Sequence, residues 1–215
     1  MVSRGLGDVY KRQAVALLVR VAFAFSAPVT EDVVGMSANA AANTDVRHFI
    51  VYVIGLFAAV TCTFGNLAAY GQTNMKRLLA YSTIAHAGYI MMAVAAAVAL
   101  VATSPEGARD AVSAVAFYLA TYLFMNLGAF GIVALLRNRL KSEEISSYAG
   151  LIRVSPGIVV ATAVVLVSLI GLPPLAGFVA KFLVFSSLVD AITAGAESPL
   201  MLSLLVIGGF NTVVS

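Results

Sequence analysis

The residue whose type and position most directly suggest chemistry is Lys181, which follows an interruption in an apolar run. The stretch 168–185 reads SLIGLPPLAGFVAKFLVF. The residues that interrupt it are Gly171, Pro173, Pro174 and Gly177. Adjacent prolines remove backbone donors and force the preceding residues toward extended geometry, so we expect one helix to end here and another to begin beyond it.

A lysine inside such a run is a candidate proton carrier. At membrane depth a charge costs at least roughly 2.5–3.5 kcal/mol. A helix break there is tolerated only where protein or a water-filled cavity satisfies the freed backbone groups. We therefore interpret Lys181 as a proton-carrying group in a hydrated path through the membrane. The alternative is that Lys181 lies near a helix end and extends its amine to the interface.

His86 is a second candidate, because an imidazole can donate and accept protons near neutral pH. Ser82, His86 and Tyr89 are spaced i, i+4 and i+7 and therefore share one helix face. The alternative is a neutral histidine that joins two helices by hydrogen bonds. The types and spacing of these residues do not distinguish between a proton relay and a structural hydrogen bond.

Polar side chains form stripes in two other apolar runs. The stripes consist of Thr63, Asn66 and Tyr70 in one run, and Tyr118, Tyr122 and Asn126 in the other. A single stripe of this kind more often joins helices than conducts ions. Several stripes together with a histidine and a lysine favour a hydrated polar axis within a bundle.

Lys76 is a further candidate at the start of an apolar run. Lys76 and Arg77 are explained by the tendency of basic residues to gather at the cytoplasmic ends of membrane helices. A lysine at that position could also pass a proton from the cytoplasm, so we keep Lys76 as a candidate for proton translocation.

The composition requires that these residues be positioned by membrane helices. The chain has 215 residues, of which 61% are hydrophobic and 11% charged, whereas a soluble domain has roughly 25% charged residues. We predict an all-α, polytopic transmembrane bundle with a discontinuous helix. Its expected segments are a truncated or foreign stub 1–13, a partial span 14–25, a loop 26–46, spans 48–70, 76–101 and 111–136, a broken span 156–189 and a partial span 200–215.

The same composition argues against several kinds of site. Cys62 is the only cysteine, and the two histidines lack the spacing of a metal motif. There is no glycine-rich phosphate loop and no cysteine set for iron–sulfur clusters. The basic residues lie in short loops and form no patch for nucleic acid. We therefore expect no cofactor or metal in this chain.

The loops differ in charge. If the spans alternate, one side carries Lys76, Arg77, Arg137, Arg139, Lys141 and Arg153. Because cytoplasmic loops gather Lys and Arg, we expect the loops 71–77 and 137–155 to be cytoplasmic.

Three motifs carry a resemblance to a known family. Residues 65–94 read GNLAAYGQTNMKRLLAYSTIAHAGYIMMAV and residues 168–182 read SLIGLPPLAGFVAKF. Both resemble the antiporter-like, proton-pumping subunits of respiratory complex I, which share a fold with Mrp-type sodium/proton antiporters. Residues 118–133, YLATYLFMNLGAFGIV, narrow the resemblance to the subunit N branch, the counterpart of mitochondrial subunit 2. The resemblance suggests a C-terminal fragment of such a subunit.

The resemblance assigns roles to individual residues. Lys181 matches the family's lysine on the broken helix, at the end of a proton half-channel. Lys76 matches the lysine of the family's KRLLAYS motif, and His86 matches a histidine often found after it. Where related pumping subunits carry a central lysine in the helix corresponding to 111–136, this chain has uncharged polar residues around Asn126.

The implied function is proton translocation by a membrane-arm subunit of NADH-quinone oxidoreductase, a translocase of the bacterial inner membrane. Its expected partners are other membrane-arm subunits, the lipid bilayer and protons. NAD, FMN, iron–sulfur clusters and quinone are expected in other subunits of the complex. Two alternatives are an Mrp-type cation/proton antiporter subunit and a structural membrane scaffold that transports nothing.

Overall fold

The chain folds into long helices. The computed structural model describes residues 37–215 and their side chains from residue 44 on. Over this part the chain forms helices and one isolated β-bridge, without a strand, as predicted. The elements are α2 (Ser37–Tyr70), α3 (Met75–Leu100), α4 (Pro105–Leu140), the 3₁₀ helix η1 (Ile145–Tyr148), α5 (Leu151–Val154), α6 (Pro156–Ile170), α7 (Ala176–Thr193) and α8 (Ser198–Val214).

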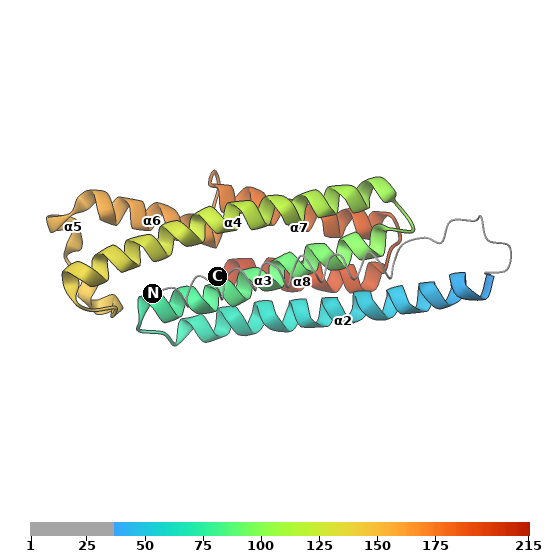
Figure 1. Cartoon of the computed structure of the whole chain (residues 1–215), viewed down its shortest axis with the longest axis horizontal. Helices are drawn as coiled ribbons and strands as arrows, with labels where there is room; N and C mark the ends of the chain where they lie inside the picture. The colour runs from blue at the N-terminus through green and yellow to red at the C-terminus, as the bar shows by residue number, and fades with distance from the viewer. Residues whose placement is uncertain (1–36) are drawn as a thin grey trace.

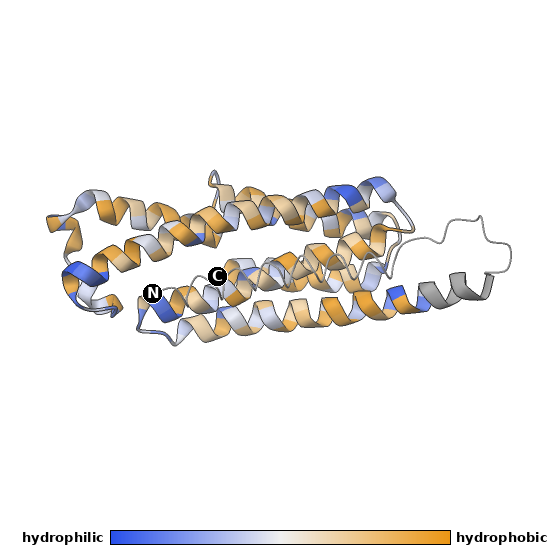
Figure 2. Cartoon of the chain, viewed as in Figure 1, coloured by the Kyte–Doolittle hydropathy of each residue, from blue (hydrophilic) through white to orange (hydrophobic). Residues whose placement is uncertain are grey.

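Most of these helices have the length and composition of membrane spans. The described helices long and apolar enough to cross a membrane are Thr44–Tyr70, Met75–Leu100, Pro105–Leu140 and Ala176–Thr193. α6 and α8 are shorter but also apolar. Hydrophobic residues extend along the helices, and hydrophilic ones gather near the ends (Figure 2). The described chain is therefore a polytopic, membrane-spanning bundle.

The start of α2 differs from that expected from the sequence. The predicted loop 26–46 is helical from Ser37 on, because α2 extends through the alanine-rich segment before the first apolar run. The predicted stub 1–13 and partial span 14–25 lie outside the described residues.

α4 is also longer than the predicted span 111–136. The Ser104 side chain accepts a hydrogen bond from the Gly107 amide, at 3.2 Å, at the start of α4. At the other end, Lys141 adopts a left-handed conformation, and its N–H donates to the Arg137 carbonyl. Caps rather than the first charged residue therefore set the length of this helix.

The helices run side by side along one long axis, and α3 lies at the centre (Figure 1). α3 contacts α2, α4, α7 and α8. Every residue of α3 from Met92 to Leu100 is buried. Many of these side chains are alanines, which allow neighbouring helices to approach closely.

α2 and α3 approach each other closely at two glycines. A Cβ atom at Gly88 would lie 2.6 Å from the backbone nitrogen of Cys62. A Cβ atom at Gly65 would lie 2.5 Å from the backbone nitrogen of Ala85. The two backbones therefore touch, and glycine is required at both crossings.

The predicted break separates α6 from α7. Gly171 ends α6 with φ 89° and donates its N–H to the Val167 carbonyl. A left-handed residue at this position favours glycine. A Cβ atom at Gly177 would fall on the Ser168 carbonyl. The first turn of α7 can therefore cross the last turn of α6 only without a side chain at position 177.

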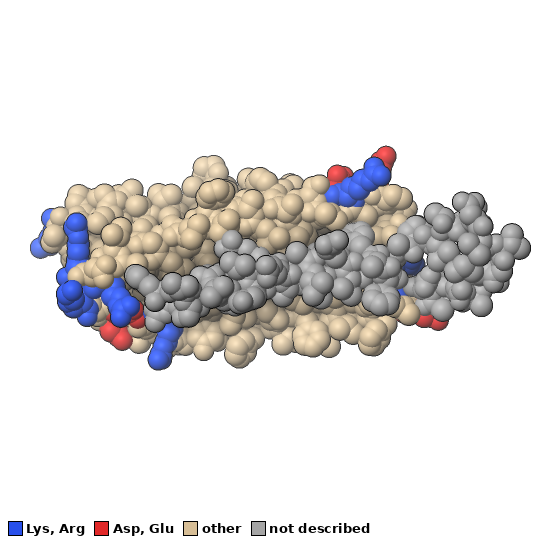
Figure 3. All heavy atoms as spheres, viewed as in Figure 1, with Lys and Arg blue, Asp and Glu red and all other residues tan. Residues whose placement is uncertain are grey.

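Charged residues gather at the two ends of the bundle (Figure 3). At the end where α4 turns toward α6, Arg137 Nε lies 3.1 Å from Glu143, and Lys76 Nζ lies 3.6 Å from it. At the other end His48 forms an ion pair with Glu197. Between these ends, the buried polar side chains include Lys181, His86, Asn66 and Asn211.

Candidate functional site

Lys181 is buried at the helix break. Only 2% of the residue is exposed, and its Nζ donates a hydrogen bond to the Ile170 carbonyl at 2.8 Å. Ile170 is the last residue of α6. The final carbonyls of a helix lack intrahelical partners and carry partial negative charge, so this position stabilises an ammonium group.

The Tyr89 ring lies against the same amine. Lys181 Nζ is 4.7 Å from the ring centroid. The Tyr89 hydroxyl is on the α8 side, 3.0 Å from Thr212 Oγ1 and 3.4 Å from the Gly208 carbonyl. The Phe185 ring of α7 meets Tyr89 edge to face, with centroids 6.3 Å apart. Tyr89 thus joins α3 to both α7 and α8.

His86 belongs to an aromatic cluster between α3 and α4. The residue is 2% exposed, and its Nδ1 lies 2.7 Å from the Tyr118 hydroxyl. The imidazole is 5.0 Å from the Tyr122 ring and 6.3 Å from the Tyr89 ring, measured between centroids. Tyr89 therefore neighbours both His86 and Lys181.

A second polar cluster joins α2 to α8. Asn66 Nδ2 donates to the backbone carbonyl of Asn211 at 3.1 Å and to its Oδ1 at 3.0 Å. Asn211 Nδ2 in turn donates to Thr63 Oγ1 at 3.1 Å. Asn211 and Thr212 were not among the residues predicted from the sequence. The signal was a polar pair within the apolar run 200–215.

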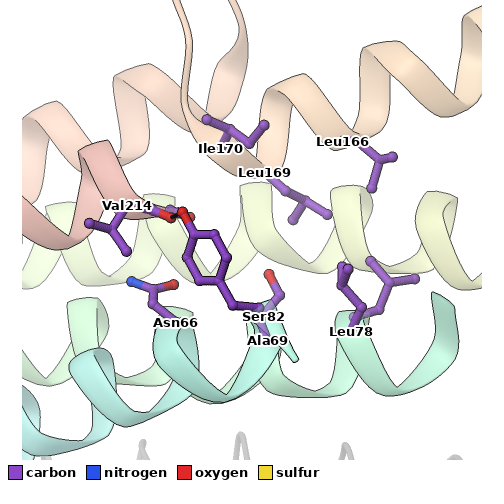
Figure 4. A pocket seen from close by; sticks show the side chains of 11 residues that line it. Asn66, Ala69, Leu78, Ser82, Leu166, Leu169, Ile170 and Val214 are labelled. Atoms are coloured by element: carbon purple, nitrogen blue, oxygen red, sulfur yellow. Dashed lines mark hydrogen bonds between the residues drawn. The ribbon is translucent and has the colours of Figure 1, made fainter. Parts of the chain in front are cut away.

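A cavity of about 300 Å³ lies beside the break, between α2, α3, α6 and α8. Its wall is largely apolar, with Asn66 and Ser82 among the polar residues (Figure 4). Leu78 and Ile170 are both among the residues that line it. Ile170 is the residue whose carbonyl accepts the hydrogen bond from Lys181.

Lys76 lies apart from these groups. It is in the first turn of α3, its side chain is 35% exposed, and its nearest acid is Glu143. Burial raises the pKa of Glu143, but the Asn74 hydrogen bond and the charges of Lys76 and Arg137 outweigh it. The net pKa of Glu143 therefore lies below its usual value. Lys76 is part of a charged cluster at the bundle end.

The remaining candidates lie around the break. Pro173 and Pro174 are exposed in the connection between α6 and α7. Asn126 is half-buried on α4. Its neighbour Met125 accepts a hydrogen bond from Ser168 Oγ, with Sδ and Oγ 2.9 Å apart. Over the described residues, the structure brings no three His, Cys, Asp or Glu side chains together in a group that could hold a metal ion.

Together, the fold and the site define the class of protein to which this chain belongs. This is a polytopic α-helical membrane protein with a discontinuous helix, whose break holds a buried lysine. Residues 29–209 match the profile of the family described as NADH:quinone oxidoreductase/Mrp antiporter, TM. The chain belongs to this family, which confirms the resemblance predicted from the motifs.

Relatives and a solved structure agree with this assignment. NADH-quinone oxidoreductase subunit N of Anaeromyxobacter sp. (strain Fw109-5) is 45% identical over 163 residues, 76% of this chain and 29% of the relative. Subunit N 2 of Chloroherpeton thalassium is 39% identical over 176 residues, 81% of this chain and 31% of the relative. A chain of respiratory complex I from Thermus thermophilus with bound Aureothin matches with a TM-score of 0.58 and 34% identity, over 76% of this chain and 33% of that one. The chain thus spans about a third of the length of these relatives.

Proposed function

We propose that this chain is part of a longer membrane-arm subunit of NADH-quinone oxidoreductase that translocates protons, driven by electron transfer from NADH to quinone. The observation that carries the proposal is the buried amine of Lys181 at the break between α6 and α7. The subunit N relatives support the same assignment. NAD, FMN, iron–sulfur clusters and quinone belong to other subunits, and further membrane-arm subunits and lipid are the partners.

The environment of Lys181 suits a group that gains and loses a proton. Its described contacts are a carbonyl at a helix end and an aromatic face, and none of the ion pairs among the described residues involves it. Both contacts favour the charged amine, whereas burial disfavours it. Because these effects oppose each other, a change of charge nearby can move the proton. The α6–α7 break is the element whose rearrangement would expose the amine to one side or the other.

A route toward Lys181 is suggested by the cavity beside the break. The residues that line it include Leu78, within the first turns of α3, and Ile170. In our proposal Lys76 acts at the mouth of this route, and Ser82 lies along it. On the opposite side of the polar axis, where α3 faces α4, His86 acts together with Tyr122 and Asn126.

The C-terminal half of α3 does not offer a continuation of this proton route. Val94 to Leu100 is buried and apolar, so no polar group there could relay a proton along α3. We propose that release from Lys181 occurs on another face of the bundle. The loops 71–77 and 137–155 face the cytoplasm of a bacterial inner membrane in this proposal.

The test is Lys181→Met in the full-length subunit, assembled in its complex. We expect proton pumping to fall by about 100-fold, as on removal of a proton-transferring side chain, with coupled quinone reduction reduced and assembly retained. Pumping is measured as acidification of inverted membrane vesicles on addition of NADH. Arg139→Met, at an exposed position of α4, is the control and should pump normally. Normal pumping by assembled Lys181→Met would refute the proposal.

A second candidate, the Mrp-type cation/proton antiporter subunit, is favoured by one observation, since the matched family includes such proteins. Neighbouring genes separate the two functions. Genes for other quinone oxidoreductase subunits support the first, and genes for small antiporter subunits support the second.

A further inference from the structure

Tyr89 has Lys181, His86 and residues of α7 and α8 as neighbours. The residue is 0% exposed. Its ring faces the Lys181 amine at 4.7 Å and lies 6.3 Å from the His86 ring. In the sequence, Tyr89 shares one helix face with Ser82 and His86. In the structure, its hydroxyl and its ring have different neighbours.

The hydroxyl of Tyr89 lies on the α8 side, next to Thr212 Oγ1 and the Gly208 carbonyl. These contacts fix the ring rather than connect it to the lysine. Thr212 itself donates to the Gly208 carbonyl at 3.0 Å. A Cβ atom at Gly208 would lie 2.8 Å from the Phe185 ring, so glycine there lets Phe185 pack against the Tyr89 edge. The ring is thus held from two helices.

What Tyr89 presents to Lys181 is therefore the face of its ring. An aromatic face carries negative electrostatic potential and attracts a cation placed over it, and this attraction is stronger where water is excluded. A neutral amine gains nothing comparable. The contact therefore distinguishes the two protonation states of Lys181, which a purely structural packing contact would not do.

We propose that Tyr89 is a positioning residue for proton transfer, whose ring holds the charged Lys181 amine against the end of α6. In this arrangement the Ile170 carbonyl and the Tyr89 face are two partners of one ammonium group. Loss of the proton weakens both contacts at once and frees the side chain to move. This inference rests on the proposed function, in which Lys181 carries a proton.

The experiment replaces Tyr89 in the full-length subunit, assembled in its complex, by phenylalanine and by its mono-, di- and trifluorinated analogues. Fluorine withdraws charge from the ring face with little change in ring size. We expect Tyr89→Phe to retain most of the pumping, and pumping per NADH oxidised to fall stepwise with fluorine number, by about tenfold for the trifluorinated ring. Assembly is followed on native gels.

The same analogues at Tyr81 are the matched control. Tyr81 is on the same helix, and its ring packs edge to face against Phe64, with centroids 6.4 Å apart. Pumping should be indifferent to fluorination at position 81. An equal response at both positions would overturn the inference, because it would reflect a general effect of fluorine.

Two further results would also overturn it. A flat response at position 89 would mean that the ring face does not act on the charged amine. Loss of pumping in assembled Tyr89→Phe would assign the role to the hydroxyl instead. Lys181→Met in the same vesicles separates these failures from failure of the proposed function. If Lys181→Met pumps normally, the proposed function is wrong. If Lys181→Met fails to pump, but pumping does not respond to fluorination at position 89, only the role of Tyr89 is wrong.

Discussion

Two lysines of this chain show how the surroundings of a residue decide its role. Lys76 is 35% exposed at the end of the bundle, next to Glu143 and Arg137. Lys181 is 2% exposed and has a carbonyl and a ring as partners. An exposed ion pair contributes little to stability and is screened by salt. A buried amine is sensitive to every nearby charge, and this sensitivity makes Lys181 the stronger candidate for proton transfer.

The ion pairs of Glu143 lead to a prediction for the loop that follows α4. The pKa of Glu143 is lowered in the folded chain, so its contribution to stability is present above the pKa of an unfolded glutamate and is lost as the pH falls through the folded pKa. We expect Glu143→Gln to destabilise the loop by less than about 1 kcal/mol at neutral pH. The difference from the wild type should disappear once the pH has fallen below the folded pKa of Glu143, which lies below the usual value of a glutamate.

Hydrogen exchange of residues 141–155, recorded at several pH values, measures this effect. Glu144→Gln is the control, because the side chain of Glu144 is exposed. Faster exchange in Glu143→Gln that persists unchanged in acid would contradict the electrostatic explanation.

At the scale of the elements, the bundle depends on positions where a side chain is forbidden. Gly177 lets α7 cross the end of α6, and Gly88 and Gly65 let α3 touch α2. Without a hydrophobic driving force between helices in lipid, close backbone packing is a main source of association. The same close packing places Tyr89, one residue after Gly88, against Lys181.

The α2–α3 crossing is tested by Gly88→Ala. The added Cβ would lie 2.6 Å from a backbone atom of Cys62, and backbone cannot yield as a flexible side chain can. We expect a loss of about 1–3 kcal/mol in the free energy of unfolding, measured as a lower thermal unfolding midpoint in detergent.

Gly131→Ala is the matched control, because a Cβ atom there meets no atom within 4 Å. Alanine at that position should be neutral or stabilising, by up to about 1 kcal/mol, through its higher helix propensity. Equal destabilisation by both substitutions would show that the crossing at Gly88 is not the cause.

At the scale of the whole molecule, the charged ends and the apolar middle indicate that the long axis of the bundle crosses the membrane. The connections after α2 and α4 lie at one end, and those after α3 and α7 at the other (Figure 1). Polar contacts tie both ends. Asn74 and Glu144 pair through a β-bridge at one end, and His48 pairs with Glu197 at the other.

Cysteine labelling tests which end is cytoplasmic. Cys62 is 0% exposed, and Cys62→Ala gives a background without thiols among the residues of this chain. Ser146→Cys and Thr103→Cys then place a thiol at opposite, exposed ends. We expect a membrane-impermeant maleimide to label position 146 in inverted vesicles and position 103 in right-side-out vesicles. The reverse pattern would invert the orientation.

The sequence by itself determined the class of fold and the break. Long apolar runs fix helices in lipid, because every backbone polar group there must be satisfied within its own segment. The pair Pro173–Pro174 fixes the interruption, since neither residue can donate a backbone hydrogen bond. The position of Lys181 after that interruption followed from the chain alone.

Only the tertiary structure decided which groups face Lys181. Ile170 ends α6 before the break, Tyr89 lies on α3, and the residues that hold Tyr89 lie on α7 and α8. Spacing along one helix assigns residues to a face, but it does not tell which neighbouring helix meets that face. That depends on how glycine and alanine let the helices approach, and the resulting packing turned the hydroxyl of Tyr89 toward α8 and its ring toward the amine.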